Sequence, residues 1–421
     1  MLAVIFNQYF ALTVAGGIEG TNWNIPLLGE VNIPGAAMWS LIVAISTGIV
    51  AISSPLLGAM ADHGILRKKL LFIYCYLGVI ATIGLYLVGE GDVLLGGMLF
   101  MLANFGFAGG NVFYNSFLVD IADVKTYGRV SGLAWGIGYI GGGLCLVLNL
   151  IMLQYPQLLG FAEGSFGVSE CMVVAGLWWG IFAIPMMLWV KDKQPSSKTI
   201  PLIKLTKYGW NSIVESFKQI KNFRQLVKFL IAFLFFNDGI ETVIIMASIF
   251  GAQIVGMNAG ELVAFFILIQ ATAFVGSLFF GWFADNTTNK LALLITLFVW
   301  VIVVLWAYFI GNIWTLKAEY YLIGILAGTV MGGSQSIARA IQASFTPEEH
   351  SAQFFGFFAV SGKFASVFGP LVFGAMIMLT GDLRLGILAI GLFFLVGIII
   401  LFTVDEKEGI DNAKRGILTA D

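Results

Sequence analysis

Long apolar runs without charge limit the folds that this chain can adopt more than any other feature. Leu70 to Gly89, Leu291 to Gly311 and Leu385 to Val404 contain no charged residue. An α-helix needs about 20 residues to cross about 30 Å of hydrocarbon, and each run is long enough. With 59% hydrophobic and 11% charged residues, the chain is too apolar for a soluble domain. Because barrel-type alternation is absent, the sequence predicts an all-α polytopic membrane protein whose first partner is the lipid bilayer.

Eleven full crossings are expected. Their approximate spans are 35–61, 70–89, 93–119, 129–153, 168–190, 226–250, 260–283, 290–311, 319–343, 353–379 and 384–404. A shorter apolar piece at 1–15 precedes them and lacks the positive n-region of a signal peptide. We interpret it as the outer half of a truncated first helix whose inner half is missing from this chain. A cleaved signal peptide is the alternative.

The two halves of the chain carry the same landmarks at the same spacing. Gly58-Ala-Met-Ala-Asp62 recurs as Gly281-Trp-Phe-Ala-Asp285, and Gly109-Gly110 recurs as Gly332-Gly333. Both recurrences have an offset of 223 residues, which indicates a tandem copy of a six-helix unit. Parallel repeats of this kind are typical of secondary transporters, whose substrate site lies near the midplane where the repeats meet.

The repeat divides the chain into four parts. We expect an N-terminal helix bundle at 1–190, a linker at 191–225, a C-terminal bundle at 226–404 and a tail at 405–421. The linker is rich in lysine, and its stretch from Trp210 to Phe223 places apolar and basic residues on opposite sides at helical spacing. This pattern predicts an amphipathic helix at the membrane surface, and a docking site for a partner is the alternative.

Positive charge is unevenly distributed between the expected loops. Of 22 Lys and Arg residues, the outer loops hold only Lys317 and Arg384, while Arg339 and Lys363 fall inside spans. The remaining 18 lie on one side. By the positive-inside rule, that side is cytoplasmic, and the C-terminal tail is expected there.

The loop between the second and third crossings carries a recognisable motif. Gly58 is followed by Asp62, Gly64 and the basic run Arg67 to Lys69, and this segment resembles the signature loop of the major facilitator superfamily. In that family the aspartate caps a neighbouring helix and pairs with basic residues, which holds the cytoplasmic gate shut. The resemblance implies gating roles for Gly58, Asp62, Arg67, Lys68, Asp285 and Arg129. A solvated loop would explain the basic residues but not the repeated Gly and Asp.

A finer resemblance extends over nearly the whole chain. The segments that carry it are Ser54-Pro55-Leu56-Leu57-Gly58, Gly128-Arg129-Val130-Ser131-Gly132 with Gly138 to Gly143, Phe236-Asn237-Asp238-Gly239, Gly332-Gly333-Ser334-Gln335-Ser336 with Arg339, and Phe354-Phe355-Gly356 followed by Ser361-Gly362-Lys363. Together they resemble the vacuole effluxer branch related to autophagy protein 22. That resemblance implies twelve helices and, as in the fungal vacuolar members, efflux of amino acids.

Charged residues inside the expected spans mark a candidate site. Asp238 and Glu241 lie midway through the seventh crossing on one helix face, Lys363 lies near the middle of the eleventh, and Arg339 lies toward the cytoplasmic end of the tenth. A charge at the bilayer centre costs about 2.5–3.5 kcal/mol on insertion scales, so such residues are usually paired and functional. Two acids near one base could exchange a proton, and a fixed ion-pair staple is the alternative.

Polar residues in the first half form a second candidate set. Asn104, Asn111 and Asn115 recur on one stripe of the fourth crossing. Uncharged hydrogen-bonding groups suit a zwitterion or a hydroxylated solute, and interhelical bonding is the alternative reading. The predicted substrate and coupling residues are therefore Asp238, Glu241, Lys363, Asn237, Asn111, Asn115, Gln335 and Arg339.

The predicted function is transport of a small polar solute, an amino acid or similar metabolite, by alternating access with coupling to protons. A carrier of sugars or nucleosides and a transport-dead sensor or scaffold remain as alternatives. A membrane enzyme is not expected, because His63 and His350 lie in short loops without metal-ligand or His-acid spacing. Cys75, Cys145 and Cys171 suggest no disulfide framework. We expect no cofactor, no metal and no nucleic-acid partner.

Overall fold

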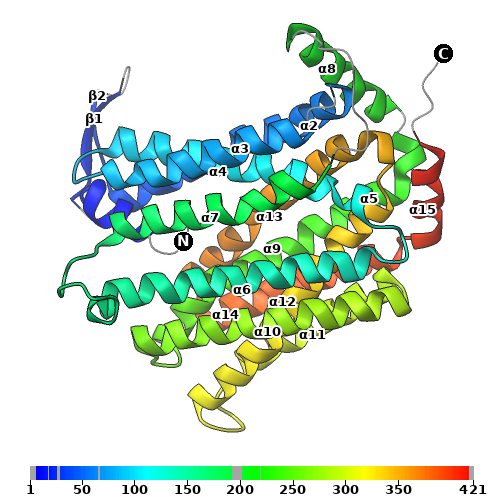
Figure 1. Ribbon diagram of the computed structural model, residues 1–421. Coiled ribbons are helices and arrows are strands. Elements are labelled where there is room, and N and C mark those ends of the chain that lie inside the picture. Colours follow the sequence, from blue (N-terminus) through cyan, green and yellow to red (C-terminus); the bar gives the residue numbers. More distant parts are fainter. Residues whose placement is uncertain are drawn as a thin grey trace. The chain divides into compact units, whose positions relative to one another are not determined.

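The computed structural model describes residues 6–17, 19–25, 29–64, 67–191, 202–218 and 220–416. In this part of the chain, eleven helices are long and apolar enough to cross a membrane, as expected (Figure 1). Many large apolar side chains on these helices are exposed, such as Ile52 at 84% and Leu371 at 64%. Such surfaces are suited to contact with lipid tails. The fold is the predicted all-α polytopic one.

The order of the helices repeats along the chain. In the first half the membrane helices are α2 (Gly35–Gly64), α3 (Arg67–Gly84), α4 (Val93–Ser116), α6 (Tyr127–Gln154) and α7 (Val168–Trp189). In the second half they are α9 (Arg224–Gln253), α10 (Ala259–Asn286), α11 (Asn289–Tyr308), α12 (Leu316–Ser344), α13 (Ser351–Thr380) and α14 (Leu383–Phe402). The starts of α10 to α13 follow those of α2, α3, α4 and α6 by 224, 222, 223 and 224 residues. These shifts match the offset of the sequence motifs.

Shorter elements lie between the membrane helices or follow the last of them. They are α5 (Leu118–Ile121), α8 (Leu202–Lys218), α15 (Glu406–Arg415) and the single turns η3 (Leu85–Leu87), η4 (Pro156–Leu159), η5 (Ile220–Phe223) and η6 (Glu348–His350). α8 falls in the linker, but it begins before the expected Trp210 and ends at Lys218, and the single turn η5 covers the end of the expected stretch. The tail is helical over α15, and residues 417–421 lie outside the described part of the chain.

The first described residues form a short helical segment, α1 (Asn7–Tyr9) and η2 (Phe10–Val14), in place of a full crossing. Phe6 and Phe10 are buried and pack on Trp39 of α2, with ring centroids 5.9 Å and 5.3 Å away. Two antiparallel strands, β1 (Thr21–Ile25) and β2 (Gly29–Ile33), follow, with Thr21 opposite Ile33. The sequence analysis does not anticipate this pair.

By packing, the chain separates into two compact units. One consists of Met1–Ser54, Ile65–Tyr114 and Leu144–Ser197; the other consists of Pro55–Gly64, Asn115–Gly143 and Lys198–Asp421. The second unit thus takes in the end of α2, α5 and most of α6 from the first repeat. These three segments of the first repeat pack with the helices of the second repeat, and the candidate site lies in this unit. The four-part division at residues 190, 225 and 404 stays a prediction.

Small residues allow very close helix packing in the second unit. A Cβ atom on Gly332 of α12 would lie 2.0 Å from the carbonyl oxygen of Ala273 on α10. A Cβ atom on Gly276 of α10 would lie 1.9 Å from the carbonyl oxygen of Thr329 on α12. Such contacts are typical of membrane helices, because lipid supplies no hydrophobic drive for association. They fix α12, and with it Gln335 and Arg339, firmly against α10.

α15 lies across the ends of the helices of the second unit (Figure 1). The Glu406 carboxylate accepts the backbone N–H groups of Asn289 and Lys290 at the start of α11, at 3.1 Å and 3.0 Å. The Gln225 side chain on α9 donates to Glu408 at 2.6 Å. A carboxylate at a helix N-terminus satisfies free donors and complements the helix dipole. α15 therefore links α9 and α11 at one end of the bundle.

Candidate transport site

The end of α2 caps the start of α13. The Asp62 carboxylate accepts the backbone N–H of Ala352 at 3.0 Å and that of Gln353 at 2.8 Å. α13 has no side-chain cap of its own at His350, so Asp62 satisfies donors that would otherwise lack partners. A Cβ atom on Gly58, one turn earlier, would lie only 2.2 Å from the carbonyl oxygen of Ala352. Glycine at this position is what lets the two helices approach so closely.

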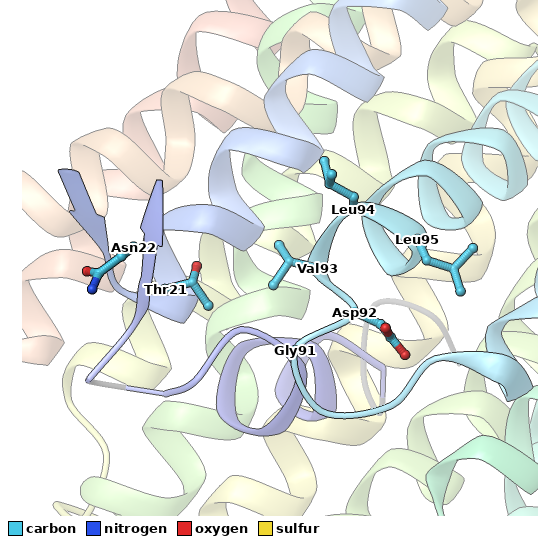
Figure 2. A pocket seen from close by; sticks show the side chains of 7 residues that line it. All are labelled: Thr21, Asn22, Gly91, Asp92, Val93, Leu94 and Leu95. Atoms are coloured by element: carbon cyan, nitrogen blue, oxygen red, sulfur yellow. The ribbon is translucent and has the colours of Figure 1, made fainter. Parts of the chain in front are cut away.

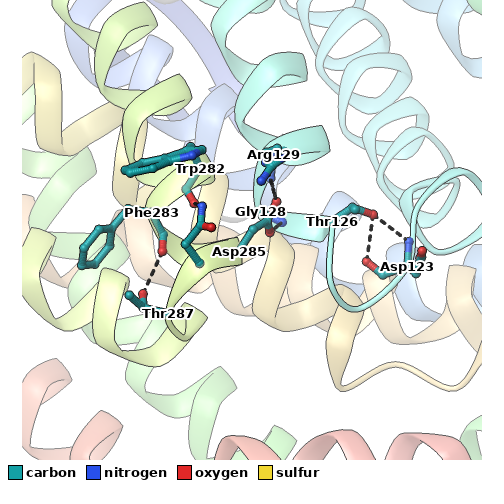
Figure 3. Close-up of polar contacts among 9 residues, drawn as sticks. Asp123, Thr126, Gly128, Arg129, Trp282, Phe283, Asp285 and Thr287 are labelled. Atoms are coloured by element: carbon teal, nitrogen blue, oxygen red, sulfur yellow. Dashed lines mark hydrogen bonds and ion pairs between the residues drawn. The ribbon is translucent and has the colours of Figure 1, made fainter.

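The second copy of the motif makes the reciprocal contact (Figure 3). Asp285, near the end of α10, accepts the backbone N–H groups of Gly128 at 2.9 Å and Arg129 at 3.0 Å, where α6 begins. The Arg129 guanidinium lies 3.5 Å from the same carboxylate. A Cβ atom on Gly281 would lie 2.5 Å from the carbonyl oxygen of Gly128. Each aspartate thus caps a helix from the other half of the chain, and we call Asp62 and Asp285 the aspartate pair.

The linker helix α8 contacts the first of these caps. The Ser212 hydroxyl donates to Gln353 Oε1 at 2.7 Å, and Gln353 Nε2 donates to Ser216 at 2.9 Å. All three side chains are buried. Gly209, one turn before Ser212, lies so close to α2 that a Cβ atom would be 2.8 Å from Met60 Cγ. Because Gln353 also donates its backbone N–H to Asp62, one residue joins α2, α8 and α13.

Arg339 connects α12 to the part of α6 in the same unit. Its Nε and Nη2 atoms donate to the hydroxyl and the carbonyl of Ser131, at 2.8 Å and 2.9 Å, and Nη1 donates to Asn115 Oδ1 at 3.2 Å. The guanidinium also lies over the Trp135 ring, 5.8 Å from its centroid. Only 5% of Arg339 is exposed. Arg339, one of the predicted substrate residues, thus bridges α12 to Ser131 on α6 and to Asn115 at the end of α4.

A chain of polar contacts leads from Arg339 further along α6 and α12. One turn before Arg339 on α12, Gln335 accepts a hydrogen bond from the Tyr139 hydroxyl of α6. Tyr139 interacts electrostatically with Glu241, and Glu241 in turn interacts electrostatically with Lys363. Tyr139 therefore interacts electrostatically with Glu241 on one side and with Arg339 on the other.

Asp238 and Glu241 have different neighbours, although they lie three residues apart on α9. Asp238 is completely buried and accepts the backbone N–H of Gly369 on α13 at 2.8 Å. Glu241 is half-buried and interacts electrostatically with Lys363 on α13. The spacing predicts that both acids share one helix face, and each interacts with a residue of α13. It does not separate the acid that bonds to backbone from the acid that meets the lysine.

The other predicted residues are more dispersed. Asn104 donates to Ser46 Oγ at 2.8 Å, which links α4 to α2 as interhelical bonding would. Asn111 is half-buried in the first unit, and Asn237 is buried beside Asp238. Arg67, the first residue of α3, is buried at 8% exposure, and Lys68 is half-buried. The three asparagines do not form one polar cluster, because Asn115 accepts a hydrogen bond from Arg339.

A hollow of about 560 Å³ lies beside the first strand and the start of α4 (Figure 2). Its lining residues are Thr21, Asn22, Gly91, Asp92, Val93, Leu94 and Leu95. Asp92 accepts the backbone N–H of Gly89 at 3.0 Å and so closes a turn. None of the predicted site residues lines this hollow, and we assign it no role.

The arrangement is better suited to changes of conformation than to catalysis of a chemical reaction. Over the described ranges, no group of three or more His, Cys, Asp or Glu side chains could hold a metal ion. The acids accept backbone N–H groups of neighbouring helices, and Glu241 interacts with Lys363. These contacts hold helices together and can be broken and remade. With eleven spans and a tandem repeat, they define an integral, multi-pass membrane transporter of the major facilitator fold.

Comparison with known proteins identifies the family of the chain. The sequence model of the family described as "Vacuole effluxer Atg22 like" matches residues 20–127 and 119–414, and the chain belongs to this family. The uncharacterized MFS-type transporter YxiO of Bacillus subtilis (strain 168) is 31% identical over 374 residues, which cover 89% of this chain and 86% of the relative. Autophagy-related protein 22-1 of Penicillium rubens is 24% identical over 93% of this chain and 78% of its own length.

Solved structures share the fold at low sequence identity. The human organic anion transporter MFSD10 (TETRAN) gives a TM-score of 0.65 at 13% identity, over 87% of this chain and 84% of that one. The fucose:proton symporter FucP of E. coli gives 0.57 at 13% identity, over 86% and 95%. The expected superfamily, family and fold are confirmed, and these relatives and structural neighbours are transporters.

Proposed function

We propose that this protein exports a small polar solute, an amino acid or a similar metabolite, by alternating access, and that proton movement drives it. The observation that carries the proposal is the aspartate pair. Asp62 and Asp285 each cap a helix of the other repeat with two backbone hydrogen bonds. Alternating access requires contacts between repeats that are strong in one state and absent in the other, and these two are of that kind.

The charge distribution orients the proposed gate. Arg67 and Lys68 follow Asp62 closely in the sequence, the Arg129 guanidinium lies 3.5 Å from Asp285, and α8 of the lysine-rich linker bonds to Gln353 beside the Asp62 cap. The positive-inside rule puts this end of the helices in the cytoplasm. The aspartate pair is then a cytoplasmic gate in its closed form, with the Arg339 contacts as its inner layer. Export requires this gate to open and load solute from the inside.

Glu241 is the proposed proton carrier. It lies half-buried in a span, near Lys363 and Tyr139, while the Asp238 carboxylate is engaged by a backbone N–H. Neutralising Glu241 removes its attraction for Lys363, so the protonation state alters how α9 is held to α13. Tyr139, which interacts electrostatically with both Glu241 and Arg339, gives this change a physical route toward the gate.

The solute class rests on family membership and on the polar groups of the site. The family is described as one of effluxers, and an acid that interacts with a lysine offers both charges that a zwitterion would need. A thermal-shift screen of the purified protein against amino acids, sugars and nucleosides would identify the solute, because a ligand that binds the folded state raises its melting temperature. Stabilisation by amino acids alone supports the proposal. Stabilisation by sugars or nucleosides instead would contradict the solute class.

A further inference from the structure

The linker helix α8 packs on the bundle through small and polar residues. Gly209, Ser212 and Ser216 lie at helical spacing on one face, and all three are buried. Gly209 allows close approach to α2, and the two serines bond to Gln353 on α13. The face of α8 that meets the protein is therefore held by close approach and hydrogen bonds, with few apolar side chains.

The opposite face of α8 is apolar and basic. Lys207, Trp210, Val214 and Lys218 follow one another at spacings of three, four and four residues, which places them on one stripe of the helix. Trp210 is 62% exposed, Val214 is 36% exposed, and the side chains of both lysines are exposed. A helix on the surface of a soluble protein turns its apolar residues inward. We call these four outward residues the α8 stripe.

The connections of α8 keep it near the membrane. α7 before it and α9 after it are both long and apolar enough to span. Residues 219–223 alone separate the end of α8 from the first residue of α9. The end of α8 therefore stays close to the level at which α9 leaves the hydrocarbon, where tryptophan side chains are enriched. Figure 1 shows α8 beside the end of α2.

The charge of the linker complements an anionic surface. Residues 191–225 contain eight Lys and Arg residues and two acids, Asp192 and Glu215, so the net charge is +6. Glu215 lies 3.9 Å from Lys218 at the side of the α8 stripe. Clusters of four to eight basic residues next to a membrane span attract anionic lipids. A basic helix with an exposed indole is also typical of helices that lie in the interface.

We propose that the α8 stripe binds anionic phospholipids of the cytoplasmic leaflet. Lys207 and Lys218 contact the phosphate groups, and Trp210 and Val214 enter the boundary between headgroups and acyl chains. This binding uses only the exposed face of α8, so it leaves the bonds to α13 in place. It does not depend on what the protein transports.

Lipid bound to α8 also affects the gate. Ser212 and Ser216 bond to the side chain of Gln353, whose backbone N–H donates to Asp62. A helix that is fixed to the membrane holds Gln353, and with it the Asp62 cap, in the observed arrangement. Anionic lipid therefore favours the closed gate. This regulation, unlike the binding itself, rests on the proposed transport function.

The binding is tested on the full-length protein in lipid nanodiscs, with a nitroxide attached through Val214→Cys. The native Cys75, Cys145 and Cys171 are buried, so the label is directed to position 214. Discs of phosphatidylcholine with and without phosphatidylglycerol are compared at constant pH. In the anionic discs, oxygen, which dissolves in lipid, should relax the nitroxide more strongly than a water-soluble nickel complex does. High salt should reverse this preference, because it screens surface charges.

Matched substitutions separate the stripe from charge in general. Lys207→Gln with Lys218→Gln should weaken the preference for anionic discs about thirtyfold, since each basic residue near such a surface contributes about 1 kcal/mol. Lys407→Gln with Lys414→Gln removes two exposed lysines from α15 and should keep the full response. Equal exposure of position 214 to water in both kinds of disc, or an equal loss in both double variants, would overturn the proposal. A stripe that stays in water would fit a protein partner instead.

The effect on the gate is measured separately, with nitroxides at positions 69 and 349. Anionic discs should increase the population with the shorter distance. Gln353→Ala should remove this dependence on lipid but keep the response at position 214. An identical distance distribution in both kinds of disc would overturn the regulatory part of the proposal. Failure of the transport function would leave the response at position 214 unchanged, so the two failures are distinguishable.

Discussion

Asp62 and Asp285 stand 223 residues apart and make the same contact in opposite directions. Asp62, in the first repeat, caps α13 of the second, and Asp285, in the second repeat, caps α6 of the first. Gly58 and Gly281, one turn before each aspartate, allow the backbones to meet. A gate built in this way has two equivalent parts, so weakening either one should shift the conformational equilibrium in the same direction.

The first prediction concerns the charge of the aspartate pair. Asp62→Asn removes the charge and leaves only one oxygen to accept the two N–H groups of α13. We expect the population with an open gate to rise about tenfold, which corresponds to about 1.4 kcal/mol. Spin labels at the exposed positions 69 and 349 would report the change as a longer distance. Asp382→Asn, at the cap of α14, is the control, and an unchanged distance distribution in Asp62→Asn would count against the gate.

The second prediction concerns how closely the backbones of α2 and α13 approach each other. Gly58→Ala adds a methyl group at a point 2.2 Å from the carbonyl oxygen of Ala352, so α2 and α13 must separate there. Alanine favours a helix over glycine by about 1 kcal/mol, so α2 itself is not weakened. The same label pair should show a more open gate. Gly138→Ala, where no neighbouring atom lies within 4 Å, should not, and equal behaviour of the two variants would contradict the packing argument.

The third prediction concerns the linker helix. Gln353→Ala removes both side-chain bonds to Ser212 and Ser216 but keeps the backbone N–H that Asp62 accepts. We expect faster amide hydrogen exchange over residues 202–218, because α8 loses two buried polar contacts of about 0.5–1.5 kcal/mol each. Gln253→Ala, an exposed position at the end of α9, serves as the control. Unchanged exchange in α8 would show that Gln353 does not hold it.

The fourth prediction concerns the coupling residues. Glu241→Gln should abolish solute movement driven by a pH gradient but leave exchange of labelled for unlabelled solute intact, because the solute path is kept while the titrating group is lost. Lys363→Ala should impair both activities, since it leaves an acid without its base in a low-dielectric site. Proteoliposomes with and without a pH gradient allow both measurements. Full gradient-driven transport by Glu241→Gln would exclude it as the proton carrier.

Much of the fold could be predicted because its signals are local. Charge-free runs set the spans, and the repeated Gly-x-x-x-Asp set the offset that the helix starts reproduce. The two strands at Thr21–Ile25 and Gly29–Ile33 could not be predicted in the same way. They are short and lie between apolar segments whose pattern dominates the sequence.

The site was only partly predictable. The aspartates carry a motif, but their partners are backbone N–H groups, which leave no mark in a sequence. Asp238 and Glu241 were assigned one role because their spacing fixes a helix face, whereas their neighbours depend on the packing of α13. The sequence does not point to Gly369, because its contact with Asp238 is made by a backbone N–H group. Ser212 and Ser216 were missed because serine is common on surfaces.

The central claim is that this chain is a carrier, and counterflow tests it most directly. Proteoliposomes containing the wild-type protein and preloaded with an unlabelled amino acid should take up the same labelled amino acid faster than protein-free liposomes. Asp62→Asn and Asp285→Asn should both alter the rate, since each weakens one half of the same gate. Absence of counterflow for amino acids, sugars and nucleosides alike, by protein shown to be folded after reconstitution, would contradict the account and favour a sensor or scaffold.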